Sequence, residues 1–167
     1  MTRGIIAGGN ISFYNDAKDN STLASAVGLQ IGYQWSKALN DKWSFGLAGV
    51  FSQVGSRSGA TTIVGQEQLD TYLAIPVSIN YNICNFYLGT GYEYAYNISQ
   101  NAWLNKNNHS AIFQLGYKLP VFDIVMKYNL GLNQEKYDSN LYAGEHNEIS
   151  LPKINTLQLS VIVPIGK

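Results

Sequence analysis

The chain has 167 residues, of which 13% are charged, about half the share typical of a soluble domain, and 13% are aromatic. Eleven Lys and Arg residues balance eleven Asp and Glu residues, so no excess charge is present to attract a nucleic acid. This length suits one domain, which we expect to cover residues 1–167.

The hydropathy pattern excludes a membrane helix but leaves a transmembrane β-barrel open. No run approaches the roughly 18 consecutive apolar residues that such a helix needs, and the mean hydropathy is -0.10. A barrel is not detected in this way, because its lipid-facing residues alternate with lumenal ones. Met1 to Arg3 lead directly into a strand-like pattern, so we expect a mature chain from which a signal peptide has been removed.

The main feature of the sequence is alternation with a period of two, which is typical of strands. Between Leu23 and Trp35 the odd positions are mostly bulky and apolar, whereas the even positions are small or polar. A strand points successive side chains to opposite faces, so this segment faces two different environments. The pattern recurs in chain order and predicts about eight strands, at residues 5–14, 23–35, 43–52, 69–81, 86–97, 113–118, 122–131 and 157–165.

The connections between the predicted strands alternate in length. Short links fall at residues 36–41, 82–85 and 119–121, and long polar links fall at residues 15–22, 54–68, 98–109 and 133–153. Short turns at one end and long loops at the other are typical of outer-membrane barrels. The sequence therefore predicts an all-β fold, an antiparallel up-and-down transmembrane barrel with both termini on the periplasmic side.

Two groups of residues interrupt the pattern. Pro76 and Pro164 lie inside predicted strands, where a proline removes a hydrogen-bond donor from the ladder, and we expect a bulge or a local gap at each. Four bulky residues occupy positions on the otherwise small and polar face: Tyr72, Tyr87, Ile112 and Val125.

Volume decides which face of the barrel points to lipid. The apolar face carries most of the aromatic and aliphatic side chains and no charged residue. An eight-stranded barrel has an interior just wide enough for side chains to fill it, so that face does not fit inside. The opposite face is rich in Gly, Ala, Ser, Asn and Gln, which suits a narrow, hydrogen-bonded lumen. We therefore expect the apolar face to contact the lipid bilayer.

The aromatic residues gather beside the short turns. Rings with one apolar and one polar edge prefer the boundary between lipid and water. We therefore predict a membrane-interface girdle formed by Tyr33, Trp35, Trp43, Phe45, Tyr81, Phe86, Tyr117 and Phe122.

The lumenal face carries a balanced set of charges, namely Asp70, Glu93, Lys118, Asp123 and Lys127. A charge in a narrow lumen needs a partner, because an unpaired one loses its hydration without compensation. Lys118 and Asp123 flank the turn at Pro120 and should face each other, while Glu93 and Lys127 lie in the middle of their strands. We predict an ion-pair network that plugs the barrel, with a gated ion path or a catalytic carboxylate as the alternative.

Two neighbouring segments carry a family resemblance. Residues Asp70 to Val77, read as DTYLAIPV, are followed by Phe86 to Gly91, read as FYLGTG. This hairpin resembles the small porin-family outer-membrane β-barrel domain of Gram-negative bacteria, whose architecture is shared with OmpA-like and OmpX-like barrels. The resemblance implies a bacterial outer-membrane location and supplies no catalytic motif.

Three functions remain open at this point. The first is a non-enzymatic barrel with a plugged lumen, structural or partner-binding, that contacts lipopolysaccharide or serves as an accessory subunit of a larger outer-membrane complex. The second is a lipid-A-modifying enzyme, for which the neighbours His109 and Ser110 in a predicted loop are the candidate residues. The third is a narrow channel.

No pattern in the sequence indicates a cofactor or a metal centre. The acidic loop with Glu135, Asp138, Glu145, His146 and Glu148 matches no calcium-binding spacing, so we interpret it as a solvated loop. The single cysteine, Cys84, lies in a predicted turn and has no nearby group that would activate its thiol.

Overall fold

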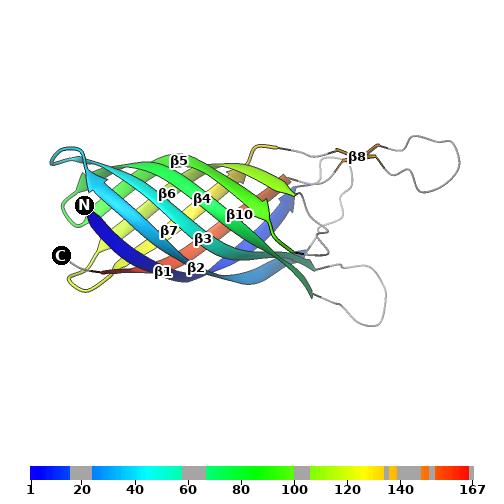
Figure 1. Cartoon of the computed structure of the whole chain (residues 1–167), viewed down its shortest axis with the longest axis horizontal. Helices are drawn as coiled ribbons and strands as arrows, with labels where there is room; N and C mark the ends of the chain where they lie inside the picture. Colours follow the sequence, from blue (N-terminus) through cyan, green and yellow to red (C-terminus); the bar gives the residue numbers. More distant parts are fainter. Residues whose placement is uncertain are drawn as a thin grey trace, which may run out of the picture.

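Eight antiparallel strands close into a barrel in the order β1-β10-β7-β6-β5-β4-β3-β2, which confirms the predicted architecture (Figure 1). The computed structural model describes residues 1–15, 24–57, 67–99, 106–133, 136–138, 148–150 and 153–165. The barrel strands are β1 (Thr2–Asn15), β2 (Ala24–Ala38), β3 (Trp43–Arg57), β4 (Glu67–Ile83), β5 (Phe86–Asn97), β6 (Asn107–Lys118), β7 (Asp123–Gly131) and β10 (Lys153–Pro164). Because β1 pairs with β10 from Gly4 to Asn15, the sheet has no open edge.

Several strands extend beyond their predicted ends. Strand β3 continues to Arg57 and β4 begins at Glu67, so the predicted loop 54–68 is shorter than expected. Strand β6 begins at Asn107, which corrects the predicted loop 98–109 and places His109 in a strand. The reason is physical: backbone pairing continues through polar residues, whereas the prediction ended each strand where apolar alternation stopped. The predicted loop 133–153 also contains a small two-stranded sheet of β8 (Lys136–Asp138) and β9 (Glu148–Ser150).

The two strand prolines lie where ladder pairing is interrupted. In the β3–β4 ladder no residues pair between the Leu47–Val77 pair and the Val50–Ala74 pair. Pro76 lies in this gap. The register is the same on both sides, so the interruption is a gap and not a bulge. Pro164 pairs with β1, but the β10–β7 ladder stops earlier, at Ile162. The gap at Pro76 was predicted, whereas Pro164 lies at the end of β10, where β7 has not yet begun, and not at a gap inside the strand. An unpredicted register shift lies between β2 and β3, from Ser25 to Gln30.

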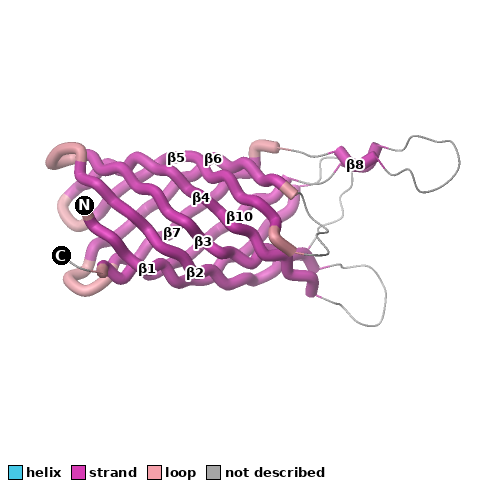
Figure 2. The backbone as a smooth tube through the Cα atoms, in the orientation of Figure 1, coloured by secondary structure: helices cyan, strands magenta, loops and turns pink. Residues whose placement is uncertain are grey.

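The short turns share one end of the barrel. They connect β2 to β3, β4 to β5 and β6 to β7, and β1 begins and β10 ends beside them (Figures 1 and 2). In the turn between β4 and β5, Cys84 is exposed and adopts a left-handed conformation with φ of 52°. Among the described residues, no helix has the length and apolar character that a membrane crossing requires.

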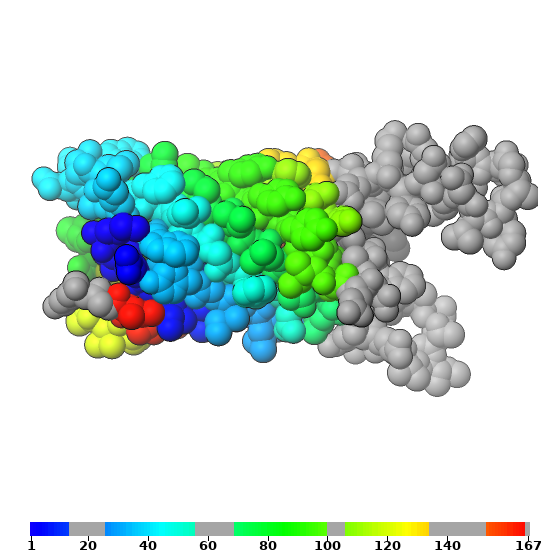
Figure 3. Space-filling model, viewed as in Figure 1, coloured from blue at the N-terminus to red at the C-terminus, as the bar shows by residue number. Residues whose placement is uncertain are grey.

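The two faces of the wall differ in exposure, as the alternation predicted. On β2, Val27, Leu29 and Ile31 expose 69%, 67% and 59% of their surface, whereas Gln30 exposes 5%. Outward side chains of this kind cover the wall that is visible in the space-filling view, from the blue of β2 to the green of β4 (Figure 3). The inward side chains fill the lumen, and the four bulky residues that interrupted the pattern are among them: Tyr72, Tyr87, Ile112 and Val125.

Substitutions at neighbouring positions of β2 test this orientation. Ile31→Arg should destabilise the protein in lipid vesicles by about 2–4 kcal/mol, because it places a charge on the face that contacts hydrocarbon. Gln30→Asn should cost less, about 1 kcal/mol, because it loses the bond to Ser160 but adds no charge and no bulk to the lumen. Urea titrations in vesicles measure both changes in the free energy of unfolding. A larger loss for Gln30→Asn than for Ile31→Arg would show that the inward and outward faces are assigned the wrong way round.

Candidate functional site in the barrel lumen

An ion pair lies inside the barrel between Glu93 on β5 and Lys127 on β7. Lys127 Nζ donates to Glu93 Oε2 at 2.7 Å, and the two side chains expose only 12% and 7% of their surface. Asn129 on β7 donates its Nδ2 to the other carboxylate oxygen, Glu93 Oε1, at 2.6 Å. Both oxygens of the carboxylate are therefore occupied by donors from a strand that is not a neighbour of β5 in the sheet.

Neutral side chains form further bridges of the same kind across the lumen. Gln30 on β2 donates to Ser160 Oγ on β10 at 2.5 Å, which joins two strands with β1 between them. Asn10 on β1 donates to Ser52 Oγ on β3 at 2.9 Å. Each bridge passes over one intervening strand. The bridges thus connect alternate strands of the wall through the interior.

A third neutral bridge follows the same rule. Gln114 on β6 donates its Nε2 to Asn80 Oδ1 on β4 at 2.5 Å, with β5 between the two strands. The same amide lies 3.4 Å from Ser78 Oγ. Hydrogen bonds between neutral side chains therefore cross the lumen, in addition to the one ion pair among the described residues.

A glycine lies beneath each neutral bridge. Gly8 pairs with both Gln30 and Ser160 in the ladders, and a Cβ atom at Gly8 would lie 2.9 Å from Ser160 Oγ. At Gly28, which pairs with Asn10, a Cβ atom would lie 2.8 Å from Asn10 Oδ1. At both glycines a Cβ atom would come closer still to a backbone carbonyl of the neighbouring strand, that of Leu159 at Gly8 and that of Gln53 at Gly28, so these positions make room for the strand backbone as well as for the bridging side chains.

Gly89 has the same role under the third bridge. It pairs with Asn80 on one side and Gln114 on the other, and a Cβ atom there would lie 2.8 Å from Gln114 Cγ. Gly116 provides space in a related way, because a Cβ atom there would overlap the buried ring of Tyr87.

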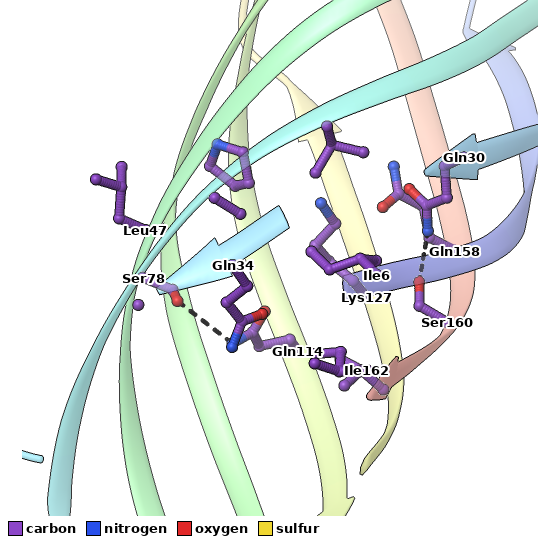
Figure 4. Close-up of a pocket in the computed structure, with 15 residues that line it drawn as sticks. Ile6, Gln30, Gln34, Leu47, Ser78, Gln114, Lys127, Gln158, Ser160 and Ile162 are labelled. Carbon is purple, nitrogen blue, oxygen red and sulfur yellow. Dashed lines mark hydrogen bonds between the residues drawn. The ribbon is translucent and has the colours of Figure 1, made fainter. Parts of the chain in front are cut away.

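The free space around these bridges differs between the middle of the lumen and its short-turn end. A cavity of about 50 Å³ in the middle of the lumen is lined by residues that include Gln30, Lys127, Gln158 and Ser160, which point into it (Figure 4). This space suits a few water molecules. A larger cavity of about 280 Å³ lies at the short-turn end, where Tyr87 is part of its lining.

The other predicted lumenal charges lie towards the two ends of the barrel, Asp70 near the long loops and Lys118 and Asp123 at the short turn between β6 and β7. Lys118 and Asp123 are ladder partners, as expected, but Lys118 Nζ donates to Asn82 Oδ1 at 2.8 Å and lies 5.6 Å from the centre of the Tyr87 ring. Asp70, which exposes 2% of its surface, accepts from Asn97 Nδ2 at 3.0 Å. The charges are therefore distributed along the lumen, and neutral amides partner Asp70 and Lys118.

The predicted girdle residues all lie on the outward face near the short turns, and several pack in pairs. Trp43 on β3 contacts Tyr81 on β4 with ring centroids 5.0 Å apart, and Tyr33 contacts Trp35 at 4.7 Å. Phe86 on β5 contacts Tyr117 on β6 at 4.6 Å. Phe45 and Phe122 expose part of their surface on the same side of the wall.

The two residues considered for catalysis point to opposite faces of β6. Ser110 exposes 1% of its surface in the lumen, whereas His109 Nδ1 bonds the hydroxyl of the outward Tyr92. Neighbouring strand residues cannot act as a nucleophile and its base in this arrangement.

The part of the chain that the structure describes contains no cluster of His, Cys, Asp and Glu side chains suited to a metal ion. The candidate loop residues Glu135, Glu145 and His146 lie outside the described residues.

Comparison with solved structures shows the fold. No family model matches the chain, and no curated protein sequence matches it. OprG from Pseudomonas aeruginosa matches with a TM-score of 0.52 and 14% identity, over 99% of this chain and 97% of that chain. Neisserial surface protein A matches with a TM-score of 0.49 and 14% identity, over 98% and 96% of the two chains. Ail of Yersinia pestis matches with a TM-score of 0.46 and 15% identity, over 98% of each.

The match to OprG confirms the predicted resemblance at the level of architecture. This chain has the fold of the small eight-stranded outer-membrane β-barrels of Gram-negative bacteria. The outer-membrane setting of OprG agrees with the predicted location.

The glycines beneath the bridges give a direct test of lumen packing. Gly89→Ala should destabilise the barrel by about 1–3 kcal/mol, because the new methyl group displaces the amides of Asn80 and Gln114. Gly49→Ala is the matched control, since a Cβ atom at Gly49 on the outer wall would meet nothing within 4 Å. Urea titration in lipid vesicles compares the two variants. Equal stabilities would mean that the bridges do not restrict the space above β5.

A double-mutant cycle tests the ion pair. Glu93→Gln and Lys127→Met should each cost about 3–5 kcal/mol, because either change leaves a buried charge without its partner. The double variant should cost clearly less than the sum, because neither charge remains. Lys118→Met, which removes a lysine bonded to a neutral amide, should cost under about 1 kcal/mol. Additive losses in the cycle would show that Glu93 and Lys127 are not coupled.

Proposed function

We propose that this chain is a non-enzymatic outer-membrane barrel that is closed to ions and serves as a structural or partner-binding element of the membrane surface. The observation that supports this best is the Glu93–Lys127 ion pair, reinforced by Asn129, within a lumen that other side chains also bridge. A closed barrel leaves the outer wall and the segments at its ends as the surfaces available for interaction.

The outer wall supports the bilayer as the first partner. Its side chains between the two barrel ends are mainly apolar, and Leu29 and Leu159 expose 67% and 61% of their surface. Such a continuous exposed apolar surface would be unstable in water. The paired aromatics beside the short turns support the proposed girdle at the periplasmic boundary, because their rings combine apolar faces with polar edges.

The lumen supports closure in preference to conduction. Glu93 and Lys127 lie in the middle of β5 and β7, and the cavity beside Lys127 has a volume of only about 50 Å³. An ion would have to displace side chains that already have hydrogen-bond partners. The interior of an eight-stranded barrel is narrow enough for such side chains to fill.

The arrangement on β6 supports a non-enzymatic role. The enzyme hypothesis relied on His109 and Ser110, which lie on opposite faces of the wall. His109 also pairs with Tyr92 in place of a nucleophile. Lipopolysaccharide and an outer-membrane protein are the partners that we propose for the outer wall and its ends.

Planar-bilayer recording tests the closed lumen. The wild-type protein should give no large, steady conductance, because the ion pair and the neutral bridges fill the pore. The double variant Glu93→Ala/Lys127→Ala should raise the conductance, since it removes the ion pair that crosses the middle of the lumen. Lys42→Ala, in the exposed turn after β2, is the control and should behave like the wild type. Large, steady conductance from the wild-type protein would overturn the proposal in favour of a channel.

A further inference from the structure

The outer wall carries a groove that crosses strands β1 to β4, which we call the wall groove. Its volume is about 550 Å³, and its lining includes Ala7, Leu29, Ile31, Phe51, Gln53 and Thr71. No charged side chain is among the described residues that line it. Alternation places these six residues on the outward face, so the groove opens to the surroundings of the barrel and not to the lumen.

Small outward residues on β1 explain the hollow at one end of the wall groove. Ala7 pairs with Ile31, and Gly9, the next outward residue of β1, pairs with Leu29. Leu29 and Ile31 are among the most exposed side chains of the wall, whereas Ala7 and Gly9 have almost no side chain to fill the space beside them. The wall is also irregular here, because the β2–β3 register shifts between Ser25 and Gln30.

The wall groove descends obliquely from the outer boundary of the wall towards its middle. Thr71 lies ten positions along β4 from Tyr81 of the proposed girdle, whereas Ile31 lies four positions along β2 from Trp35. At about 3.3 Å per residue and a tilt of about 40°, these separations correspond to roughly 25 Å and roughly 10 Å along the barrel axis. The outward apolar band of such barrels is about 25 Å tall. The end at Thr71 is therefore level with the outer limit of this band, and the end at Ala7 and Ile31 lies within it.

The upper end of the wall groove is polar. Gln53 and Thr71 are ladder partners on β3 and β4, and their chain neighbours Ser52 and Asp70 are buried inwards. Within the described part of the chain neither side chain has a hydrogen-bond partner, although the backbone N–H of Thr71 donates to Ser99 Oγ at 2.7 Å. An amide and a hydroxyl each offer a donor and an acceptor, and polar groups beside hydrocarbon need partners. This end therefore suits a neutral group that both donates and accepts.

The bilayer supplies the occupant, because the wall groove is continuous with the surface that contacts lipid. An acyl chain suits the apolar part at Ala7, Ile31 and Phe51, and its linkage to the headgroup then meets Gln53 and Thr71. An ester linkage offers acceptors only. An amide linkage beside a hydroxyl offers N–H and O–H donors as well as a carbonyl acceptor. The polar end therefore favours an amide-linked chain over the ester-linked chains of a glycerophospholipid.

We propose that the wall groove binds an amide-linked, hydroxylated acyl chain of lipopolysaccharide, with the amide and hydroxyl at Gln53 and Thr71. The chain descends past Phe51 and Ile31 to the hollow at Ala7. The inference rests on the proposed function, in which lipopolysaccharide is a partner of the outer wall, and it names the part of that lipid that the wall recognises.

Native mass spectrometry of the protein in nanodiscs tests the site with two probes that share a headgroup. Sphingomyelin has an amide-linked chain beside a hydroxyl, whereas phosphatidylcholine has ester linkages, and both carry phosphocholine. In mixed nanodiscs the wild-type protein should retain sphingomyelin about fivefold above its share of the bilayer, which corresponds to about 1 kcal/mol for one hydrogen bond. Gln53→Leu should abolish this enrichment and should lower the retention of lipid A, added in a second set of nanodiscs, by a similar factor.

Matched variants separate the polar end from the apolar end. Thr71→Val should weaken the enrichment, whereas Thr90→Val, which removes an outward hydroxyl that already donates to the Ile112 carbonyl, should behave like the wild type. Ala7→Leu fills the hollow and should lower the retention of lipid A. Gly49→Leu is its control, because Gly49 lies outside the wall groove and a Cβ atom there would meet nothing within 4 Å.

The outcomes are distinct from those that test the membrane assignment. A chain that does not enter nanodiscs would overturn both the proposed function and the site. A wild-type protein that enters them but retains the two phosphocholine lipids in their bilayer ratio would overturn the site alone, and this comparison needs no variant. Unchanged enrichment in Gln53→Leu, or equal retention of lipid A by Ala7→Leu and Gly49→Leu, would also overturn the site.

Discussion

The narrow interior of an eight-stranded barrel is the constraint on which the rest of this structure depends. Side chains must fill the lumen, and polar ones must find partners there. This chain meets both needs with bridges that pass over one strand, such as Gln30 to Ser160 above Gly8. The glycine and the bridging amide are complementary, because the space that one leaves is occupied by the other. The ion pair between Glu93 and Lys127 extends the same arrangement to charged groups.

Much of this architecture could be predicted from the period of two, because exposure in a barrel wall follows the alternation of side chains. The alternation around Gln30 predicted which residues face inward, and opposite charges in the middle of two strands predicted the contact of Glu93 with Lys127. Strand ends could not be predicted in this way, because backbone ladders continue through polar residues such as His109. Lys118 and Asp123 face each other as predicted, but the hydrogen bond from Lys118 to Asn82 could not be predicted, since several neutral amides lie nearby and sequence spacing does not rank them.

The outer wall is less uniform than the alternation suggests. Near the short turns its aromatic residues pack against one another, as Trp43 does with Tyr81. At the other end of β5 and β6 the hydroxyls of Tyr92 and Tyr94 are paired with His109 and Asn107. Rings at both ends thus suit a boundary between apolar and polar surroundings, and at the long-loop end the Lys106 ammonium group lies near the Tyr96 ring face. The two ends of this part of the wall are therefore chemically different, as the two leaflets of an asymmetric membrane are.

The bridge from Gln30 to Ser160 has a consequence for how the barrel assembles. Its two residues are 130 positions apart in the chain, and the strand between them, β1, must pair with β10 at the opposite terminus. Neither end of the chain can complete this part of the lumen without the other, so polar groups here have no protein partner while the sheet is still open. Contacts between such distant segments slow folding, because the chain loses entropy before they form. Assembly should therefore be concerted, with the last seam of the wall and the polar filling of the lumen completed in the same step.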